Sequence, residues 1–363
     1  MIPPRADAAT ARTALLGAAE DRWTSFDRHV HPLRGPAGEE LSTDVVRFGA
    51  PIGEADSVVL VSSGVHGVEG HAGNGLQQLL LGEGRLERLP PRTAVVLLHA
   101  VNPYGFAWSR RVDHTNIDVN RNFVDYADLP DNPRYGEIDP ILNPAELDLD
   151  DPSYLTELLA FWQSVGDDVA FRTISGGQYS HPRGVQFGGQ GPSWSRTTLE
   201  RIWDQHLVGA RHALALDVHT GLGPRGRLTV FQTADGHEPA AALGPAWFAD
   251  WLYRSDRTGS VDHGLLGVGF DAWAAARPDR PAVATFVIEF GTLDPTAGVG
   301  VFRADNWLHH HGDPRSEVGE RIRAAMRDFF DLDDDAWRRD VADQGLDALH
   351  RALDGIAAGD HLP

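Results

Sequence analysis

The chain has 363 residues, and its 42% hydrophobic content is sufficient for a folded core. Its 52 acidic and 32 basic residues give a formal net charge of −20, which argues against nucleic acid or an anionic membrane surface as a partner. The absence of cysteine excludes disulfides and thiolate metal sites. Neither a signal-peptide pattern nor an apolar run long enough to span a membrane is present, so we expect a cytoplasmic protein.

The first part of the chain predicts alternating strands and helices. We expect a helix at 9–29, strands at 41–49, 57–63 and 93–100, and a helix at 70–81. The run 57–63 is almost continuously apolar, which is typical of a strand buried on both faces of a parallel or mixed sheet. Strand–helix–strand alternation of this kind indicates an α/β fold.

The second part of the chain begins with a long irregular stretch at 124–198, which we interpret as an insertion that covers a substrate site. Within and after it we expect helices at 153–165, 195–209, 239–254, 313–330 and 334–356, and strands at 213–218, 227–232 and 282–289. The whole chain, 1–363, is predicted to form one domain with its core at about 40–330 and a C-terminal helix at 331–363. The fold class is α/β, with a mixed, mostly parallel central sheet flanked by helices.

The loop after the strand 57–63 has the residue types of a metal site. It contains His66 and Glu69, three residues apart, among Gly64, Gly67 and Gly70. Imidazole and carboxylate are ligands of catalytic zinc, which takes three protein groups and keeps a fourth position open. The glycines permit a tight turn around a small object. A His-x-x-Glu pair alone is common, so the prediction depends on a third ligand elsewhere.

His219 is the candidate for that third ligand, because it also follows an apolar strand and precedes a glycine turn at Gly221. An isolated histidine at such a position usually has a hydrogen-bonded structural role. Together with His66 and Glu69, however, it completes a ligand set. If Asp217 lies on the same face of the strand as His219, its carboxylate can orient the imidazole, as carboxylates often do at zinc sites.

Glu289 ends the apolar strand 282–289. A glutamate at a strand end can simply reach solvent, but a partly desolvated carboxylate beside an activated water is what a general base for hydrolysis requires. Three arginines and an asparagine offer partners for substrate oxygens: Arg110, Arg111, Asn120 and Arg121. Arginines near a hydrolytic metal stabilise an oxyanion or bind a carboxylate, although a solvated charge cluster is the alternative.

Two further stretches are candidates for smaller roles. The segments 175–181, which contains Tyr179, and 186–189 carry glycines and polar groups suited to a substrate pocket. The run His309-His-His311 suggests a second metal site, but adjacent side chains cannot all point the same way, so a helix end with polar packing is favoured.

Five motifs in order along the chain resemble the zinc carboxypeptidases, in particular a bacterial branch of carboxypeptidase A-like proteins. They resemble the aspartoacylase and succinylglutamate desuccinylase group more distantly. The motifs are His66-x-x-Glu69, Asn102-Pro-Tyr-Gly, Ile117-Asp-Val-Asn120-Arg121-Asn-Phe, Asp217-x-His219 and Glu289. The resemblance covers about residues 40–310.

This resemblance implies one zinc ion per chain, bound by His66, Glu69 and His219, with Glu289 as general base and acid. It further implies that Asn120 and Arg121 hold a terminal carboxylate, and that Arg110 or Arg111 is the oxyanion arginine; we favour Arg111. The mobile tyrosine of the digestive enzymes has only a weak counterpart, Tyr253.

The implied activity is hydrolysis of an amide or peptide bond next to a carboxylate-bearing residue. An N-acyl amino acid deacylase would use the same residues. The alternative from another class is an inactive module that binds peptide C-termini. Retention of all three ligands together with the base argues against it.

Overall fold

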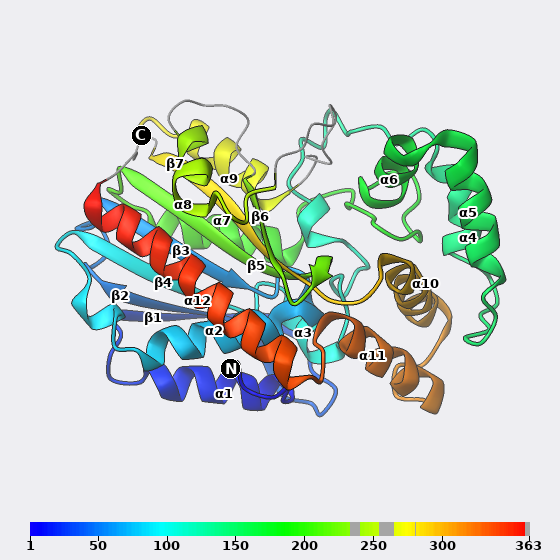
Figure 1. Ribbon diagram of the computed structural model, residues 1–363, viewed down its shortest axis with the longest axis horizontal. Helices are drawn as coiled ribbons and strands as arrows, with labels where there is room; N and C mark the ends of the chain where they lie inside the picture. The colour runs from blue at the N-terminus through cyan, green and yellow to red at the C-terminus, as the bar shows by residue number, and fades with distance from the viewer. Residues whose placement is uncertain (233–239, 254–264, 280, 360–363) are drawn as a thin grey trace.

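A computed structural model describes residues 1–232, 240–253, 265–279 and 281–359. Its centre is a seven-stranded sheet in the order β1-β2-β4-β3-β5-β7-β6 (Figure 1). The strands are β1 (Ser25–Arg34), β2 (Glu40–Gly49), β3 (Ser57–Ser63), β4 (Thr93–His99), β5 (His212–Arg225), β6 (Leu228–Gln232) and β7 (Ala282–Gly291). The central strands β4, β3, β5 and β7 are parallel, whereas β1, β2 and β6 pair antiparallel with their neighbours. The predicted single α/β domain with a mixed sheet is therefore confirmed.

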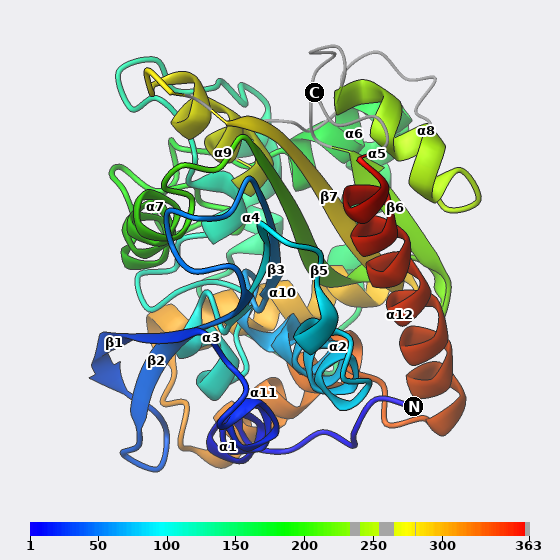
Figure 2. The same cartoon turned by 90° about the vertical axis from the view of Figure 1, so that its left-hand side faces the viewer.

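Helices cover both faces of this sheet, which is why every residue of β3 and β4 is buried. On one face the core includes side chains of α1 (Ala8–Ala19), α2 (Gly70–Gly82), α8 (Leu243–Phe248) and α12 (Asp335–Ala358). On the other face it includes side chains of α7 (Trp194–His206) and α9 (Leu266–Ala275). Figure 2 shows α12 and α2 on one side of the sheet and α7 on the other.

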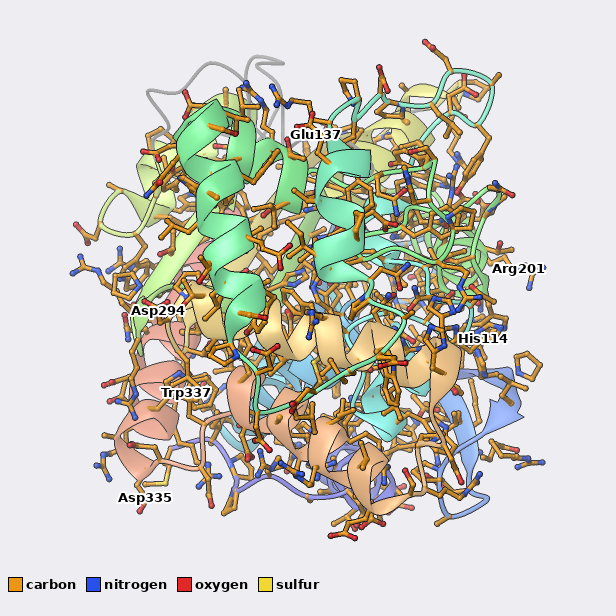
Figure 3. All side chains as sticks on the ribbon, turned by 90° about the vertical axis from the view of Figure 1, so that its right-hand side faces the viewer. His114, Glu137, Arg201, Asp294, Asp335 and Trp337 are labelled. Atoms are coloured by element: carbon orange, nitrogen blue, oxygen red, sulfur yellow. The ribbon has the colours of Figure 1, made fainter. Side chains whose placement is uncertain are left out.

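A group of helices lies beyond the carboxyl end of β7 (Figure 1). It consists of α4 (Tyr135–Leu142), α5 (Ser153–Val165), α6 (Asp167–Ser175), α10 (Pro295–His311) and α11 (Glu317–Phe330). Figure 3 shows this face, with Glu137 in α4 and with Asp294 and His114 on opposite sides of the view. The first three helices enclose a small separate core made of Tyr135, Ile138, Leu142, Phe161 and Ala170. We call α4, α5 and α6 the side lobe.

Several element predictions need correction. The helix expected at 9–29 ends at Ala19, and residues 25–29 belong to β1, an edge strand whose polar sequence hides its strand character. The stretch 124–198, expected to be irregular apart from its predicted helices, also contains α4 and α6. The helix expected at 239–254 is shorter, and its two end residues lie outside the described residues. No helix among the described residues is long and apolar enough to cross a membrane.

Candidate metal centre

Three neighbouring parallel strands bring the predicted site residues to one edge of the sheet. β3 leads into the loop of His66 and Glu69, β5 carries His219, and β7 carries Glu289. In the parallel pairing of β5 with β7, His219 lies directly beside Glu289. The carboxyl ends of parallel strands are the usual place for ligand binding in open α/β sheets.

His66, Glu69 and His219 form a compact donor set. One ligand atom from each residue lies within 4.8 Å of the others, and all three residues are buried. It is the single set of three or more such donors among the described residues. Both imidazole Nδ1 atoms face Glu69, at 2.9 Å for His66 and 2.8 Å for His219. Two imidazole nitrogens and a carboxylate oxygen around one point fit a divalent metal such as zinc.

The outward nitrogen of each imidazole is held by a different aspartate. His66 Nε2 donates to Asp118 Oδ1 at 3.2 Å, and His219 Nε2 donates to Asp217 Oδ2 at 2.6 Å. These bonds fix the tautomer that leaves both Nδ1 atoms available as metal ligands. Asp217 therefore does lie on the His219 face of its strand. Asp118 is an orienting residue that the sequence analysis missed.

A further residue lies behind each aspartate. Arg111 Nη1 donates to Asp118 Oδ2, and the Ser62 hydroxyl donates to Asp217 Oδ1 at 2.6 Å. Burial alone would raise the pKa of Asp118, but the charges of Arg111 and His66 hold it well below its ordinary value. Asp118 is therefore an anion that connects a candidate ligand to a candidate catalytic arginine.

The electrostatics of the donor set favour a cation. Burial opposes ionisation of Glu69, yet the charge of His66 and hydrogen bonds from both histidines lower its pKa to about 2. Burial likewise opposes a charged His219, but Asp217 and Glu69 raise the pKa of His219 well above its ordinary value. Three carboxylates contact the two histidines: Glu69, Asp118 and Asp217. A metal ion can take the place of the protons that otherwise compensate this negative charge.

Glu289 lies beside the donor set without belonging to it. Its Oε1 accepts a hydrogen bond from the backbone N–H of Leu222 at 2.9 Å, which fixes one carboxylate oxygen. Burial, followed by the charge of Glu69, raises the pKa of Glu289 to about 8, while His219 and Arg111 oppose the shift. A bound cation would favour its carboxylate form. The position and environment suit a residue that accepts a proton and later returns it.

The two adjacent arginines have different surroundings. All three guanidinium nitrogens of Arg110 donate within a buried network that contains Asp113, Asn116, Asp305 and His309. Arg111 instead uses only Nη1, toward Asp118 and Gln186, and in the described part of the chain its Nε and Nη2 have no hydrogen-bond partner. Arg111 is also close enough to Glu289 to act on its pKa. Of the two, Arg111 has donors left for a substrate oxygen.

Asn120 and Arg121 lie on the segment that follows Asp118, and Tyr179, from the segment after α6, contacts Arg121. The Arg121 guanidinium donates to the carbonyls of Ser175, at 3.2 and 2.7 Å, and of Asn120, at 2.6 Å. The Tyr179 hydroxyl donates to the Arg121 carbonyl at 2.6 Å, and Asn120 Oδ1 accepts from the Leu266 N–H at 2.8 Å. These bonds tie the segment of Asn120 and Arg121 to the side lobe through Ser175, at the end of α6.

The glycines of the metal loop permit close packing against α3 (Pro103–Trp108). A Cβ on Gly67 would lie 2.1 Å from the carbonyl carbon of Gly105, so no side chain fits there. Gly64 has φ +68°, a conformation that glycine adopts readily. Gly64 and Gly67 are therefore required by the backbone path that places His66 and Glu69.

The remaining candidates lie outside this centre. His309 accepts from Arg110 at 2.8 Å and His310 is within hydrogen-bond distance of Asn116, so these residues provide polar packing at the end of α10, as favoured above. Tyr253 is half-exposed and its ring packs near that of Phe231. Besides Asp118, the sequence analysis did not single out Gln186 as a partner of Arg111, because nothing in its segment shows that it contacts the earlier loop.

A family model described as "Protein of unknown function (DUF2817)" matches residues 6–344. The chain belongs to this family. A comparison of this DUF2817 chain with curated proteins finds no match.

Several solved structures are similar to this chain, and the first named here, with a TM-score above 0.5, supports the fold. Bovine thrombin-activatable fibrinolysis inhibitor, solved in complex with tick carboxypeptidase inhibitor, has a TM-score of 0.52 at 10% identity, with 98% of each chain covered. The carboxypeptidase A from Helicoverpa armigera has a TM-score of 0.47 at 12% identity, covering 88% of the DUF2817 chain and 74% of its own. A succinylglutamate desuccinylase from Silicibacter sp. has a TM-score of 0.37 at 14% identity, covering 85% and 70%. The predicted zinc carboxypeptidase-like fold is confirmed.

Proposed function

We propose that this DUF2817 protein is a zinc-dependent hydrolase that cleaves an amide bond next to a carboxylate-bearing residue. The observation that carries the proposal is the convergence of His66, Glu69 and His219 with Glu289 on the next strand. Three ligands of this type, together with a separate carboxylate, are the minimal equipment for metal-assisted hydrolysis.

His66 and His219 through Nδ1, and Glu69 through its carboxylate, would hold one zinc ion. When bound, the ion supplies Lewis acidity and lowers the pKa of a water that it contacts. Glu289 accepts a proton from the attacking water as the new C–O bond forms. It then donates that proton to the leaving nitrogen as the C–N bond breaks.

Arg111 is assigned to the oxygen of the scissile carbonyl. Its Nε and Nη2 donors stabilise the negative charge that develops there, and such stabilisation is often the largest single contribution to amide hydrolysis. Asn120 and Arg121 are assigned to the substrate carboxylate, with Tyr179 supporting them through its bond to the Arg121 carbonyl.

The substitution Glu289→Gln tests the mechanism. It keeps the size of the side chain and the contact with the Leu222 N–H but removes the proton acceptor. We expect stoichiometric zinc and a loss of hydrolysis by about three orders of magnitude or more, as for removal of an essential base. Zinc is measured by elemental analysis and hydrolysis by release of a free amine. Full activity of the variant would mean that Glu289 is not the base.

A second candidate is N-acyl amino acid deacylation, because a deacylase would use the same zinc ligands, the same base and the same arginine. Terminally blocked peptides and N-acyl amino acids, each with a free or an amidated carboxylate, separate the two activities. Preference for the free acid supports the carboxylate requirement. Zinc binding without hydrolysis of any compound would instead support the peptide-binding module.

A further inference from the structure

Gln186 has a backbone conformation that its residue type disfavours. Its φ is +60°, in the left-handed region that a non-glycine residue adopts only at a cost. Neighbouring bonds hold it there, since the Gln186 carbonyl accepts from Gln178 N–H at 3.1 Å and the next carbonyl, of Phe187, accepts from Asp118 N–H at 2.8 Å. Glycine would fit this backbone without strain, so the glutamine side chain needs a separate explanation.

The side chain of Gln186 contacts the arginine assigned to the substrate oxygen. Gln186 is buried, and its Oε1 accepts a hydrogen bond from Arg111 Nη1 at 3.1 Å. The same nitrogen donates to Asp118, and the ring of Phe302 lies 5.5 Å from the guanidinium carbon. Arg111 is therefore held on three sides, by an anion, a neutral amide and an aromatic ring.

We propose that Gln186 is a positioning residue, which fixes the plane of the Arg111 guanidinium so that Nε and Nη2 point toward the substrate. This inference rests on the proposed function for its catalytic consequence. If Asp118 were the only acceptor, the guanidinium of Arg111 could rotate about that single contact. Gln186 provides a second acceptor for Nη1 and so restricts the rotation. The residue type fits the role, because a neutral amide orients Arg111 without adding a second negative charge beside that of Asp118.

The test compares Gln186→Gly with the wild type in the zinc-loaded full-length protein. Glycine removes the contact and also relieves the backbone, so an unfolding temperature equal to or above that of the wild type is expected. Because oriented donors act in the transition state, kcat should fall by about 10-fold or more while KM changes little. Zinc content should stay stoichiometric, since Gln186 contacts no candidate ligand in the described residues. A rise in KM with an unchanged kcat would contradict the positioning role.

A double-mutant cycle with Arg111→Ala provides the second readout. If Gln186 acts through Arg111, adding Gln186→Gly to Arg111→Ala should change kcat less than twofold. Additive losses in the cycle would overturn the proposal.

The third readout does not depend on activity. Nitrogen-15 NMR measures the rotation of the Arg111 guanidinium, which should be slower in the wild type than in Gln186→Gly. Equal rotation in the two proteins would also overturn the proposal. If the rotation differs as expected but the wild type hydrolyses no amide, the proposed function fails while the positioning role of Gln186 stands.

Discussion

The two candidate histidine ligands have matching first partners and different second partners. His66 contacts Asp118, which in turn contacts the cation Arg111. His219 contacts Asp217, which in turn contacts the neutral hydroxyl of Ser62. We call these the arginine arm and the serine arm. Both orient an imidazole, but only the arginine arm continues to a group assigned to the substrate.

The difference shows how one aspartate can serve both metal and substrate. The Ser62 hydroxyl can donate or accept, so the serine arm can adapt when its aspartate changes. A guanidinium can only donate, so the arginine arm cannot adapt when its aspartate changes. Perturbing the arginine arm should therefore affect catalysis as well as zinc affinity, and perturbing the serine arm should affect zinc affinity alone.

Among substitutions in the two arms, the largest effect is expected from Asp118→Asn. The amide keeps one acceptor oxygen but presents an NH₂ group either to His66 or to Arg111, and both of these need an acceptor. Zinc affinity should fall about 10- to 100-fold, as for loss of an orienting carboxylate. With saturating zinc, kcat should still fall about 100-fold or more because Arg111 is misplaced. If excess zinc fully restored the kcat of Asp118→Asn, the arginine arm would act only on zinc affinity, as the serine arm does.

An intermediate effect is expected from Asp217→Asn, the matched control on the serine arm. Its amide can accept from His219 while donating to the Ser62 oxygen, so the geometry survives and only the charge is lost. Zinc affinity, measured by competition with a chromophoric chelator, should fall about 10-fold. We expect kcat at saturating zinc to stay within about threefold of the wild type. A loss as large as that of Asp118→Asn would show that the two arms are equivalent.

The smallest effect is expected from Ser62→Ala. It removes one buried hydrogen bond to Asp217 and leaves the bond to His219 in place. The free energy of unfolding of the metal-free protein, measured in urea, should fall by about 1 kcal/mol. Zinc affinity should change only a few-fold. A collapse of zinc binding would mean that the hydroxyl, and not the carboxylate, fixes His219.

The residues at strand ends were predictable from the sequence. His66, His219 and Glu289 each follow an apolar run, and parallel strands end at the same edge of a sheet, so their proximity follows from the fold class. Asp217 was predictable because side chains two residues apart share a face of a strand.

The residues that come from loops were not predictable in this way. Asp118 and Gln186 meet because Asp118 N–H donates to the carbonyl of Phe187, a long-range contact between two segments without periodicity. The start of α10 was not predicted, although Asp294 caps it and Pro295 occupies its first turn. β1 was hidden because an edge strand need not show an apolar face.

The side lobe has its own small core and is tied to the segment of Asn120 and Arg121 through Ser175, at the end of α6. Substitutions inside that core can therefore alter the outer wall of the site without disturbing the sheet that carries the ligands. We expect relatives of this protein to diversify in the side lobe and so acquire new substrates. Under the proposed function, this layout lets natural selection change the specificity of the site without changing the residues assigned to hydrolysis.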